Sequence, residues 1–234
     1  MHTKPSDAAK VYGDRSFVRM MWLKVTSVYL VLSLNHNVLF QDADLVWFRD
    51  PLPYFEHVAD DQVDTFWMDD GARSARYTPW YANSGFYFLR ANPRVLFFMH
   101  RLLMSYDIIQ AVRSHQHALI MLLTDLMAKH GLTAQLLSPL DFPQGQVFHH
   151  KKDVMRDFVS GAREPYVFHM CWTASRVDKL RYLKNIALWF IDPKCHEDSW
   201  QNVSTYHDRS CCLAGAKAFT TPTPYTDEIV LASK

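Results

Sequence analysis

Glycine is scarce in this chain, which contains seven glycines among 234 residues. No two of them are spaced as Gly-x-Gly or as the Gly-x-x-x-x-Gly-Lys pattern of a P-loop. A glycine-rich loop whose backbone amides wrap the phosphates of a nucleotide is therefore excluded. If the protein binds a nucleotide, a metal ion and basic side chains must hold its phosphates.

The chain also lacks an excess of one charge sign and a long apolar run. It has 25 Lys and Arg against 24 Asp and Glu, a net charge of +1, which excludes binding of nucleic acid through bulk charge. The longest apolar candidate, residues 17–40, is interrupted by charged and polar side chains, and residues 1–10 lack the apolar stretch of a signal peptide. We therefore expect no nucleic-acid partner and no membrane segment within this chain.

Cysteine is rare as well, and the absence of a Cys-x-x-Cys pair argues against a zinc ribbon or a thioredoxin motif. Three cysteines lie around the sequon at Asn202, an arrangement that suits an oxidising, glycosylating compartment but equally fits free thiols and an unused sequon. Adjacent cysteines rarely bridge each other, because their Cα atoms are only about 3.8 Å apart. A partner must therefore lie elsewhere, and the nearest other cysteine predicts a disulfide from Cys195 to Cys211 or Cys212.

Apolar spacing and capping residues divide most of the chain into alternating helices and strands. The predicted helices are 17–34 capped by Ser16, 93–106 capped by Asn92, 115–130 capped by Ser114, and 175–190. The predicted strands are 38–40, 65–68, 86–89 opened by Gly85, 132–137 and 166–170. This alternation predicts an α/β fold of the Rossmann-like kind, a mainly parallel sheet flanked by helices with ligands beyond the carboxyl ends of the strands. The predicted domain spans 17–192, between an irregular N-terminus, 1–16, and an irregular tail, 193–234.

Two carboxylates, Asp42 and Asp44, directly follow the predicted strand 38–40. With 20 aspartates in the chain, one Asp-x-Asp spacing is expected by chance, so the position of the pair carries the argument. Carboxylates beside a buried strand are costly to desolvate and repel each other, and a hard cation such as Mn²⁺ or Mg²⁺ relieves both penalties. A purely structural pair is the alternative. A two-metal phosphohydrolase is disfavoured, because the chain has four glutamates and no second carboxylate cluster that would join this pair.

Four sequence motifs, in the same order along the chain as in a known family, resemble that family. Residues 37–51, Asn-Val-Leu-Phe-Gln-Asp-Ala-Asp-Leu-Val-Trp-Phe-Arg-Asp-Pro, resemble the signature of the nucleotide-diphospho-sugar transferase family that includes plant cell-wall arabinosyl and xylosyl transferases. Residues 83–90, residues 142–145, and residues 169–173 with Lys179 resemble its later blocks. The resemblance implies a GT-A fold, a UDP-sugar donor, a divalent metal, and transfer to a glycan or glycoprotein acceptor with retention of anomeric configuration. Together with the cysteine pattern, it implies the lumen of the Golgi or the secretory pathway.

The resemblance assigns roles to side chains near the ends of several predicted strands. Asp42, Asp44 and His169 match metal ligands, although a histidine on an apolar strand is more often a core residue. Lys179 matches a lysine that contacts the donor diphosphate, and Lys24 would approach the diphosphate from the other side unless it is a solvated side chain. We also expect contacts to the donor sugar from Asn83, Ser84 and Gly85. The alternative is that these three residues only form the turn that leads into the strand. The expected catalytic residues, which would lie near the anomeric carbon, are Gln116 and His115.

The chain departs from the family pattern at several positions. His115 stands where the family has a carboxylate that holds hydroxyl groups of the donor sugar, and Cys171 and Ser175 replace the more usual Asn and Gly. Only 41 residues precede Asp42, so we expect this chain to lack the upstream strand and loop that bind the base and ribose in a complete GT-A domain. Two hypotheses follow: a metal-dependent glycosyltransferase, or a catalytically impaired relative that acts as a carbohydrate-binding module.

Overall fold

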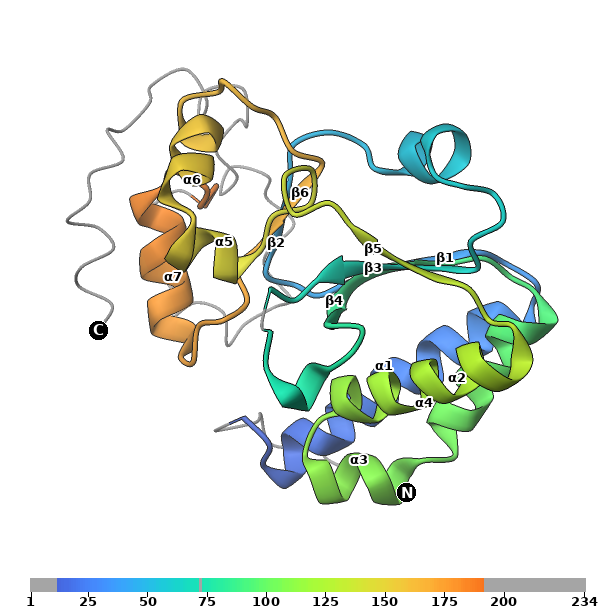
Figure 1. Cartoon of the computed structure of the whole chain (residues 1–234). Coiled ribbons are helices and arrows are strands. Elements are labelled where there is room, and N and C mark those ends of the chain that lie inside the picture. Colours follow the sequence, from blue (N-terminus) through green and yellow to red (C-terminus); the bar gives the residue numbers. More distant parts are fainter. Residues whose placement is uncertain (1–11, 72, 192–234) are drawn as a thin grey trace, which may run out of the picture.

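A four-stranded sheet organises the fold in the computed structural model, which describes residues 12–71 and 73–191 (Figure 1). In order across the sheet, its strands are β1 (Val38–Gln41), β4 (Ala82–Leu89), β3 (Thr65–Asp69) and β5 (Ala134–Leu137). β4 is antiparallel to both β1 and β3, whereas β3 and β5 are parallel. Three strands therefore run in one direction and β4 runs against them. The predicted α/β class is confirmed, with a sheet that is mixed because of β4.

The connection between β3 and β4 explains why β4 is reversed. Parallel neighbours need a crossover, usually a helix, and the described part of segment 70–81 contains only the short 3₁₀ turn η2 (Ala75–Tyr77). The reversal brings the amino end of β4 to the edge of the sheet where β1 and β3 end. β4 also begins earlier than predicted, because Asn83 and Ser84 lie inside the strand and not in a turn before it.

Four helices cover one face of this sheet, below it in Figure 1. They are α1 (Arg15–Ser33), α2 (Pro93–Leu103), α3 (Tyr106–Val112) and α4 (His115–His130). Their buried apolar residues form one core with Trp67 of β3 and Tyr87 of β4. This core holds α1 and α4 against the sheet, so that both helices reach the edge where β4 begins.

The ends of these helices follow the prediction in part. Asn92 caps α2 as predicted, because its side-chain oxygen accepts a hydrogen bond from the N–H of Val95. The cap of α1 is Asp14 and not Ser16, since the Asp14 carboxylate accepts from the N–H of Phe17 at 2.7 Å. The helix predicted over 93–106 ends earlier, at Leu103, and α3, which follows after a bend of 60°, was not predicted.

Aromatic residues from outside the four helices cover the opposite face of the sheet. Phe55, in the π-helical turn η1 (Tyr54–Val58), stacks on Phe88 of β4 with ring centroids 4.5 Å apart. Phe142 packs beside them against Phe86. Both faces of the sheet are therefore buried, which is why its strands have nearly continuous apolar sequences.

A second layer stands beside the main sheet (Figure 1). It consists of the antiparallel strands β2 (Leu45–Trp47) and β6 (Val167–His169) and the helices α5 (Gly145–His150), α6 (Lys152–Val159) and α7 (Arg176–Asn185). Leu45 pairs with His169, so the end of β6 lies beside the residue that follows Asp44. β2, α5 and α6 were not predicted. β2 and α5 are too short to show a clear apolar period, whereas Met155 and Phe158 of α6 have the helical spacing that could have revealed this helix. α7 also ends at Asn185, before the predicted 190.

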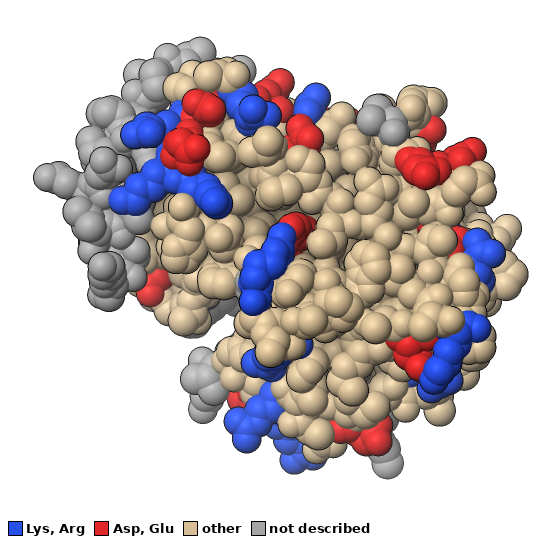
Figure 2. All heavy atoms as spheres, in the orientation of Figure 1, with Lys and Arg blue, Asp and Glu red and all other residues tan. Residues whose placement is uncertain are grey.

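Three further expectations concern the surface charge, a membrane-spanning segment and the C-terminal tail. On the face shown in Figure 2, acidic and basic side chains are interspersed and do not form a continuous basic patch. Within the described ranges, no single helix is long and apolar enough to cross a membrane, while α2 and α3 pass the same test only as a bent pair. The predicted tail, with the sequon at Asn202 and the disulfide of Cys195, lies outside the described residues.

Candidate active site

One cleft collects all the residues that the sequence analysis assigned to a donor, metal or catalytic site. It has a volume of about 1100 Å³ and lies at the edge of the sheet where β1 and β3 end and β4 begins. The predicted residues that line it are Lys24, Asp42, Asp44, Asn83, Ser84, Gly85, His115, Gln116, His169 and Lys179. The fold thus brings together side chains from both layers that lie far apart in the sequence.

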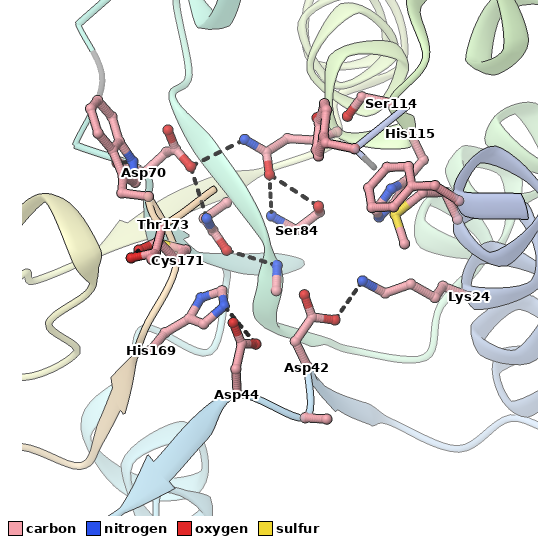
Figure 3. A pocket seen from close by; sticks show the side chains of 18 of the residues that line it. Lys24, Asp42, Asp44, Asp70, Ser84, Ser114, His115, His169, Cys171 and Thr173 are labelled. Carbon is pink, nitrogen blue, oxygen red and sulfur yellow. Dashed lines mark hydrogen bonds and ion pairs between the residues drawn. The ribbon is translucent and has the colours of Figure 1, made fainter. Parts of the chain in front are cut away.

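Five of these residues form a group of charged side chains, the ionic cluster: Asp42, Asp44, His169, Lys24 and Lys179. Asp42, which follows β1, forms an ion pair with Lys24 of α1. Asp44 contacts Nε2 of His169 at 3.2 Å through Oδ1 and forms an ion pair with Lys179 of α7 through Oδ2. Figure 3 shows the two carboxylates side by side, with His169 next to Asp44 and Lys24 next to Asp42.

Gly85 lets β4 pass close to the ionic cluster. The N–H of Asp42 donates a hydrogen bond to the carbonyl oxygen of Gly85 at 2.7 Å. A Cβ atom on Gly85 would lie 2.2 Å from Cε1 of His169 and 3.0 Å from Oδ2 of Asp42, and the first of these distances is impossible without movement. A larger residue at position 85 would therefore displace His169 from Asp44.

In the ionic cluster, the partners of Asp44 and His169 shift the pKa values of these residues more than burial does. Burial opposes ionisation of Asp44, but the hydrogen bond and charge of His169, together with the ammonium group of Lys179, hold the pKa of Asp44 well below its ordinary value. Burial also opposes protonation of His169, which is 3% exposed, but the neighbouring Cys171 and Asp44 raise the pKa of this imidazole well above its ordinary value. Asp44 is therefore ionised at neutral pH and surrounded by cationic partners.

The donor atoms of the ionic cluster fit a divalent cation. One ligand atom each of Asp42, Asp44 and His169 lies within 4.8 Å of the other two, so these residues could hold a metal ion. Because a histidine ligand must be neutral, a bound cation would displace the proton that His169 carries in the protein alone. Two carboxylates and an imidazole suit Mn²⁺, which accepts both oxygen and nitrogen ligands, and suit Mg²⁺ less well. With three protein ligands, an octahedral ion keeps positions for the oxygen atoms of a substrate.

A second group of four side chains, the amide cluster, consists of Asp70, Asn83, Ser84 and Gln116. Oδ1 of Asp70 accepts from Nδ2 of Asn83 at 2.8 Å and from Nε2 of Gln116 at 3.2 Å. Oε1 of Gln116 accepts from the N–H of Ser84 at 3.0 Å and from its hydroxyl at 3.1 Å. These bonds join the amino end of β4 to the first turn of α4 and to the residue after β3 (Figure 3).

Asp70 is a charged residue of this cleft that the sequence analysis missed. The sequence places it in a polar loop, whereas in the structure it is 5% exposed and lines the cleft. Burial raises the pKa of Asp70, and the hydrogen bonds from Asn83 and Gln116 only partly offset this effect because these partners carry no charge. One signal could have found it, since Asp70 follows a buried strand just as Asp42 does.

His115, the first residue of α4, is neutral. Its side chain is buried, and Nδ1 has no hydrogen-bond partner among the described residues. Burial and the nearby ammonium group of Lys24 lower the pKa of His115 to about 3. The imidazole therefore offers the cleft an uncharged hydrogen-bonding group at every physiological pH.

Comparison with known families shows what kind of protein has this cleft. The model of the nucleotide-diphospho-sugar transferase family matches residues 1–183. The chain belongs to this family. As the name of the family says, its members are transferases that use nucleotide-diphospho-sugars. The resemblance seen in the four sequence blocks is thereby confirmed.

Individual relatives of this family member are glycosyltransferases by name. A UDP-galactose:fucoside alpha-3-galactosyltransferase of Dictyostelium discoideum is 26% identical over 212 residues, covering 80% of this chain and 30% of that protein. A beta-arabinofuranosyltransferase of Arabidopsis thaliana is 26% identical over 198 residues, covering 77% and 36%. A UDP-D-xylose:L-fucose alpha-1,3-D-xylosyltransferase of Arabidopsis thaliana is 31% identical over 65 residues, covering 28% and 17%. The chain thus spans about a third or less of the length of these relatives.

A solved structure is also similar to this chain. It is a glycosyltransferase involved in the glycosylation of the major capsid of PBCV-1, with 12% identity and a TM-score of 0.42. The match covers 78% of this chain and 80% of that chain.

Proposed function

We propose that the protein transfers a sugar from a UDP-linked donor to a glycan or glycoprotein acceptor, in a reaction that depends on Mn²⁺ or Mg²⁺. The observation that carries this proposal is the convergence of Asp42, Asp44 and His169 to within 4.8 Å at the edge of the sheet. Family membership supports the reaction class. The names of two relatives, which specify UDP-galactose and UDP-D-xylose as donors, support the choice of UDP.

The ionic cluster would bind the diphosphate end of the donor. Asp42, Asp44 and His169 would hold the metal ion, which when bound supplies positive charge to stabilise the departing diphosphate. Lys24 and Lys179 pair with the two carboxylates in the protein alone. In the donor complex we expect both ammonium groups to turn to phosphate oxygens, because a point charge binds phosphate strongly.

The amide cluster would bind the sugar end of the donor. Its members already satisfy most of one another's hydrogen bonds, so their positions are set before the donor arrives. Asn83 and Gln116 both donate to Oδ1 of Asp70, and we expect Oδ2 of the same carboxylate to accept a hydrogen bond from a hydroxyl of the donor sugar. His115 offers a second, neutral contact from the start of α4.

Retention of anomeric configuration is the stereochemical part of the proposal. The names of the galactosyl and xylosyl relatives specify alpha-linked products. Because UDP-galactose and UDP-xylose carry their sugars in alpha linkage, an alpha product corresponds to retention. Proton NMR of the first product formed by this protein tests the point, because the coupling constant of the anomeric proton distinguishes the two anomers. A product of inverted configuration would contradict it.

Ligand-dependent melting tests the donor and the metal together. The melting temperature is measured with Mn²⁺ alone, with UDP alone, with both, and with Mn²⁺ plus UDP-galactose, UDP-xylose or UDP-arabinofuranose. We expect a rise with Mn²⁺ and UDP together that exceeds the sum of the separate rises, because a ligand that binds only the folded state stabilises it. Equal melting temperatures in all mixtures would contradict nucleotide binding.

A carbohydrate-binding module without transfer activity is the second candidate, and one observation favours it. The amide of Gln116 forms hydrogen bonds with Ser84 and Asp70, and the neighbouring His115 carries no charge. Neither predicted catalytic residue therefore offers a negative charge to the anomeric carbon. Glycan binding without nucleotide binding would support this candidate. A His115→Asp variant sharpens the test, because a gain of transfer activity would identify the missing carboxylate as the impairment.

The compartment of the protein is a further part of the proposal. Relatives from a plant and from Dictyostelium discoideum are glycosyltransferases, and the cysteines near Asn202 suit a Golgi or secretory lumen. Cys171 is free in the structure. Peptide mapping without reductant should show Cys195 linked to Cys211 or Cys212 and Cys171 unlinked, whereas four reduced thiols in protein from its native compartment would contradict the lumenal assignment.

A further inference from the structure

Trp172 is an exposed aromatic residue in the wall of the cleft. Its side chain lines the cleft, and the residue is 44% exposed. Its backbone has a φ of 59°, in the left-handed region that a bulky side chain rarely occupies. Such a conformation persists only where the surrounding structure enforces it, and it is concentrated at binding sites.

Contacts on two sides hold Trp172 in this position. Its indole Nε1–H donates a hydrogen bond to the backbone carbonyl oxygen of Asp70, the residue that follows β3, at 2.9 Å. The ring of His150 meets the indole edge-on at 6.2 Å between centroids. The backbone before Trp172 is also confined, since a Cβ atom on Gly145 would lie 1.9 Å from the carbonyl oxygen of Cys171. The indole is therefore ordered before any ligand arrives, which reduces the entropy cost of binding.

Trp172 lies on the opposite side of the two carboxylates from Lys24. Figure 3 shows Asp70, Cys171 and Thr173 on one side of the two carboxylates, with Lys24 and His115 on the other. Trp172 lies between Cys171 and Thr173 in the chain and is bonded to Asp70. Trp172 therefore borders the reacting centre beside Asp70 of the amide cluster, on the side of the two carboxylates away from Lys24.

We propose that the exposed face of Trp172 is the binding platform for the pyranose ring of the acceptor. The proposal rests on the proposed glycosyltransferase function and adds the location of the second substrate. A pyranose has an apolar face of C–H groups and a rim of hydroxyls, which matches an indole face bordered by the polar groups of Asp70 and Thr173. Partial exposure of the ring leaves room for a glycan or glycoprotein that extends into solvent, whereas a small donor would be enclosed.

Fluorine NMR of protein labelled with 5-fluorotryptophan tests the contact directly. The resonance of Trp172 is assigned by its loss in Trp172→Phe protein. The probes are methyl α-L-fucopyranoside, methyl β-D-galactopyranoside and methyl α-D-xylopyranoside, each added to protein saturated with Mg²⁺ and UDP. We expect at least one glycoside to shift the Trp172 resonance, and we expect uridine alone to leave it in place. A shift with uridine and none with any glycoside would overturn the proposal, because the indole would then stack on the nucleobase.

Kinetics with the same glycosides separate a binding platform from a structural residue. We expect Trp172→Leu to raise the acceptor KM about tenfold with the donor KM changed less than about twofold, and Trp172→Phe to restore most of the acceptor affinity. The matched control is Trp47→Leu, because Trp47 is 43% exposed and does not line the cleft. Equal rises in the acceptor and donor KM, or no rise in either, would overturn the proposal.

Failure of this inference is distinguishable from failure of the proposed function. If UDP and Mn²⁺ bind and sugar is transferred, but Trp172→Leu leaves the acceptor KM unchanged, only the acceptor platform is wrong. If UDP does not bind in the presence of Mn²⁺, the proposed donor site is wrong. If a glycoside shifts the Trp172 resonance in protein that does not bind UDP, the platform stands and the protein acts as a carbohydrate-binding module.

Discussion

The ionic cluster and the amide cluster lie in the same cleft, and each contains a largely buried aspartate. The pKa values of these two aspartates are nevertheless shifted in opposite directions. The pKa of Asp44 is lowered against its burial, because His169 and Lys179 bring positive charge to it. The pKa of Asp70 is raised by burial, because Asn83 and Gln116 offer hydrogen bonds without charge. The difference shows that the charge of the hydrogen-bonding partners, and not burial alone, decides the direction in which the pKa of a buried carboxyl group shifts.

The two buried histidines repeat this contrast. His169 has Asp44 beside it and a raised pKa, whereas His115 has Lys24 nearby and a lowered pKa. One end of the cleft is therefore organised by full charges and the other by neutral hydrogen bonds. In the proposed reaction, the first would bind the diphosphate and its metal, and the second would bind the uncharged sugar.

Removing a carboxylate from the ionic cluster should have the largest effect on this contrast. We expect Asp44→Ala to reduce the affinity for UDP in the presence of Mn²⁺ by at least about 100-fold, since even outer partners of a metal site are worth about 10–100-fold. Isothermal titration calorimetry measures the loss, and circular dichroism should show an unchanged fold. The matched control is Asp61→Ala, which removes an exposed aspartate outside the cleft. A variant that binds Mn²⁺ and UDP as well as wild type would remove Asp44 from the metal site.

Crowding the boundary between the two clusters should have the next largest effect. We expect Gly85→Ala to push His169 away from Asp44, with about a tenfold loss of Mn²⁺-dependent UDP binding and a loss of about 1–3 kcal/mol in the free energy of unfolding. Gly131→Ala is the control: its Cβ atom would meet nothing within 4 Å, but its positive φ costs about 1–2 kcal/mol. Stability should therefore fall in both variants and ligand affinity only in the first. Equal ligand affinities would show that His169 tolerates the displacement.

Neutralising one lysine should have a smaller effect, restricted to charged ligands. We expect Lys179→Ala to weaken UDP binding about threefold to tenfold and to leave uridine binding unchanged, because an ammonium group acts mainly on phosphate. Lys184→Ala, on the same helix α7 and outside the cleft, controls for general loss of positive charge. The loss should shrink at high salt, where partly exposed charges are screened. Equal losses for UDP and uridine would indicate damage to the cleft rather than a phosphate contact.

The smallest effect is a difference in the pH dependence of stability. A raised pKa makes ionised Asp70 destabilising, so wild type loses this part of its stability as the pH rises above about 4, the ordinary aspartate value. A lowered pKa makes ionised Asp44 stabilising above that pH, and this part is lost as the pH falls towards its folded-state pKa.

Melting temperatures between pH 3 and pH 7, measured with a chelator present, test these signs. Relative to wild type, we expect Asp70→Asn to become more stable as the pH rises and Asp44→Asn to become less stable. For a chain of this size, a shift of about 2–4 °C corresponds to about 1 kcal/mol. Slopes of the same sign for the two variants would contradict the contrast between the clusters.

Local signals in the sequence predicted the elements that are long or capped. The apolar period of α1, the Asn92-Pro93 start of α2 and the buried strand β3 were read correctly, because each signal acts within a few residues. The same approach failed where the decisive contact is distant. β2 was missed because the strand with which it pairs among the described residues, β6, is more than 100 positions away in the sequence. The start of β4 was misplaced because Asn83 and Ser84 form hydrogen bonds with Asp70 and Gln116.

The sequence by itself determined the α/β class, the family, the carboxylates beyond β1 and ten of the residues that line the cleft. Only the tertiary structure decided that Asp44 pairs with Lys179, a residue 135 positions away, that Asp70 joins the site, and that Trp172 stands exposed in its wall. The physical reason is that capping and apolar periodicity depend on neighbours in the chain, whereas ion pairs, burial and pKa values depend on neighbours in space. Those neighbours exist only after β4 has reversed and the two layers have packed.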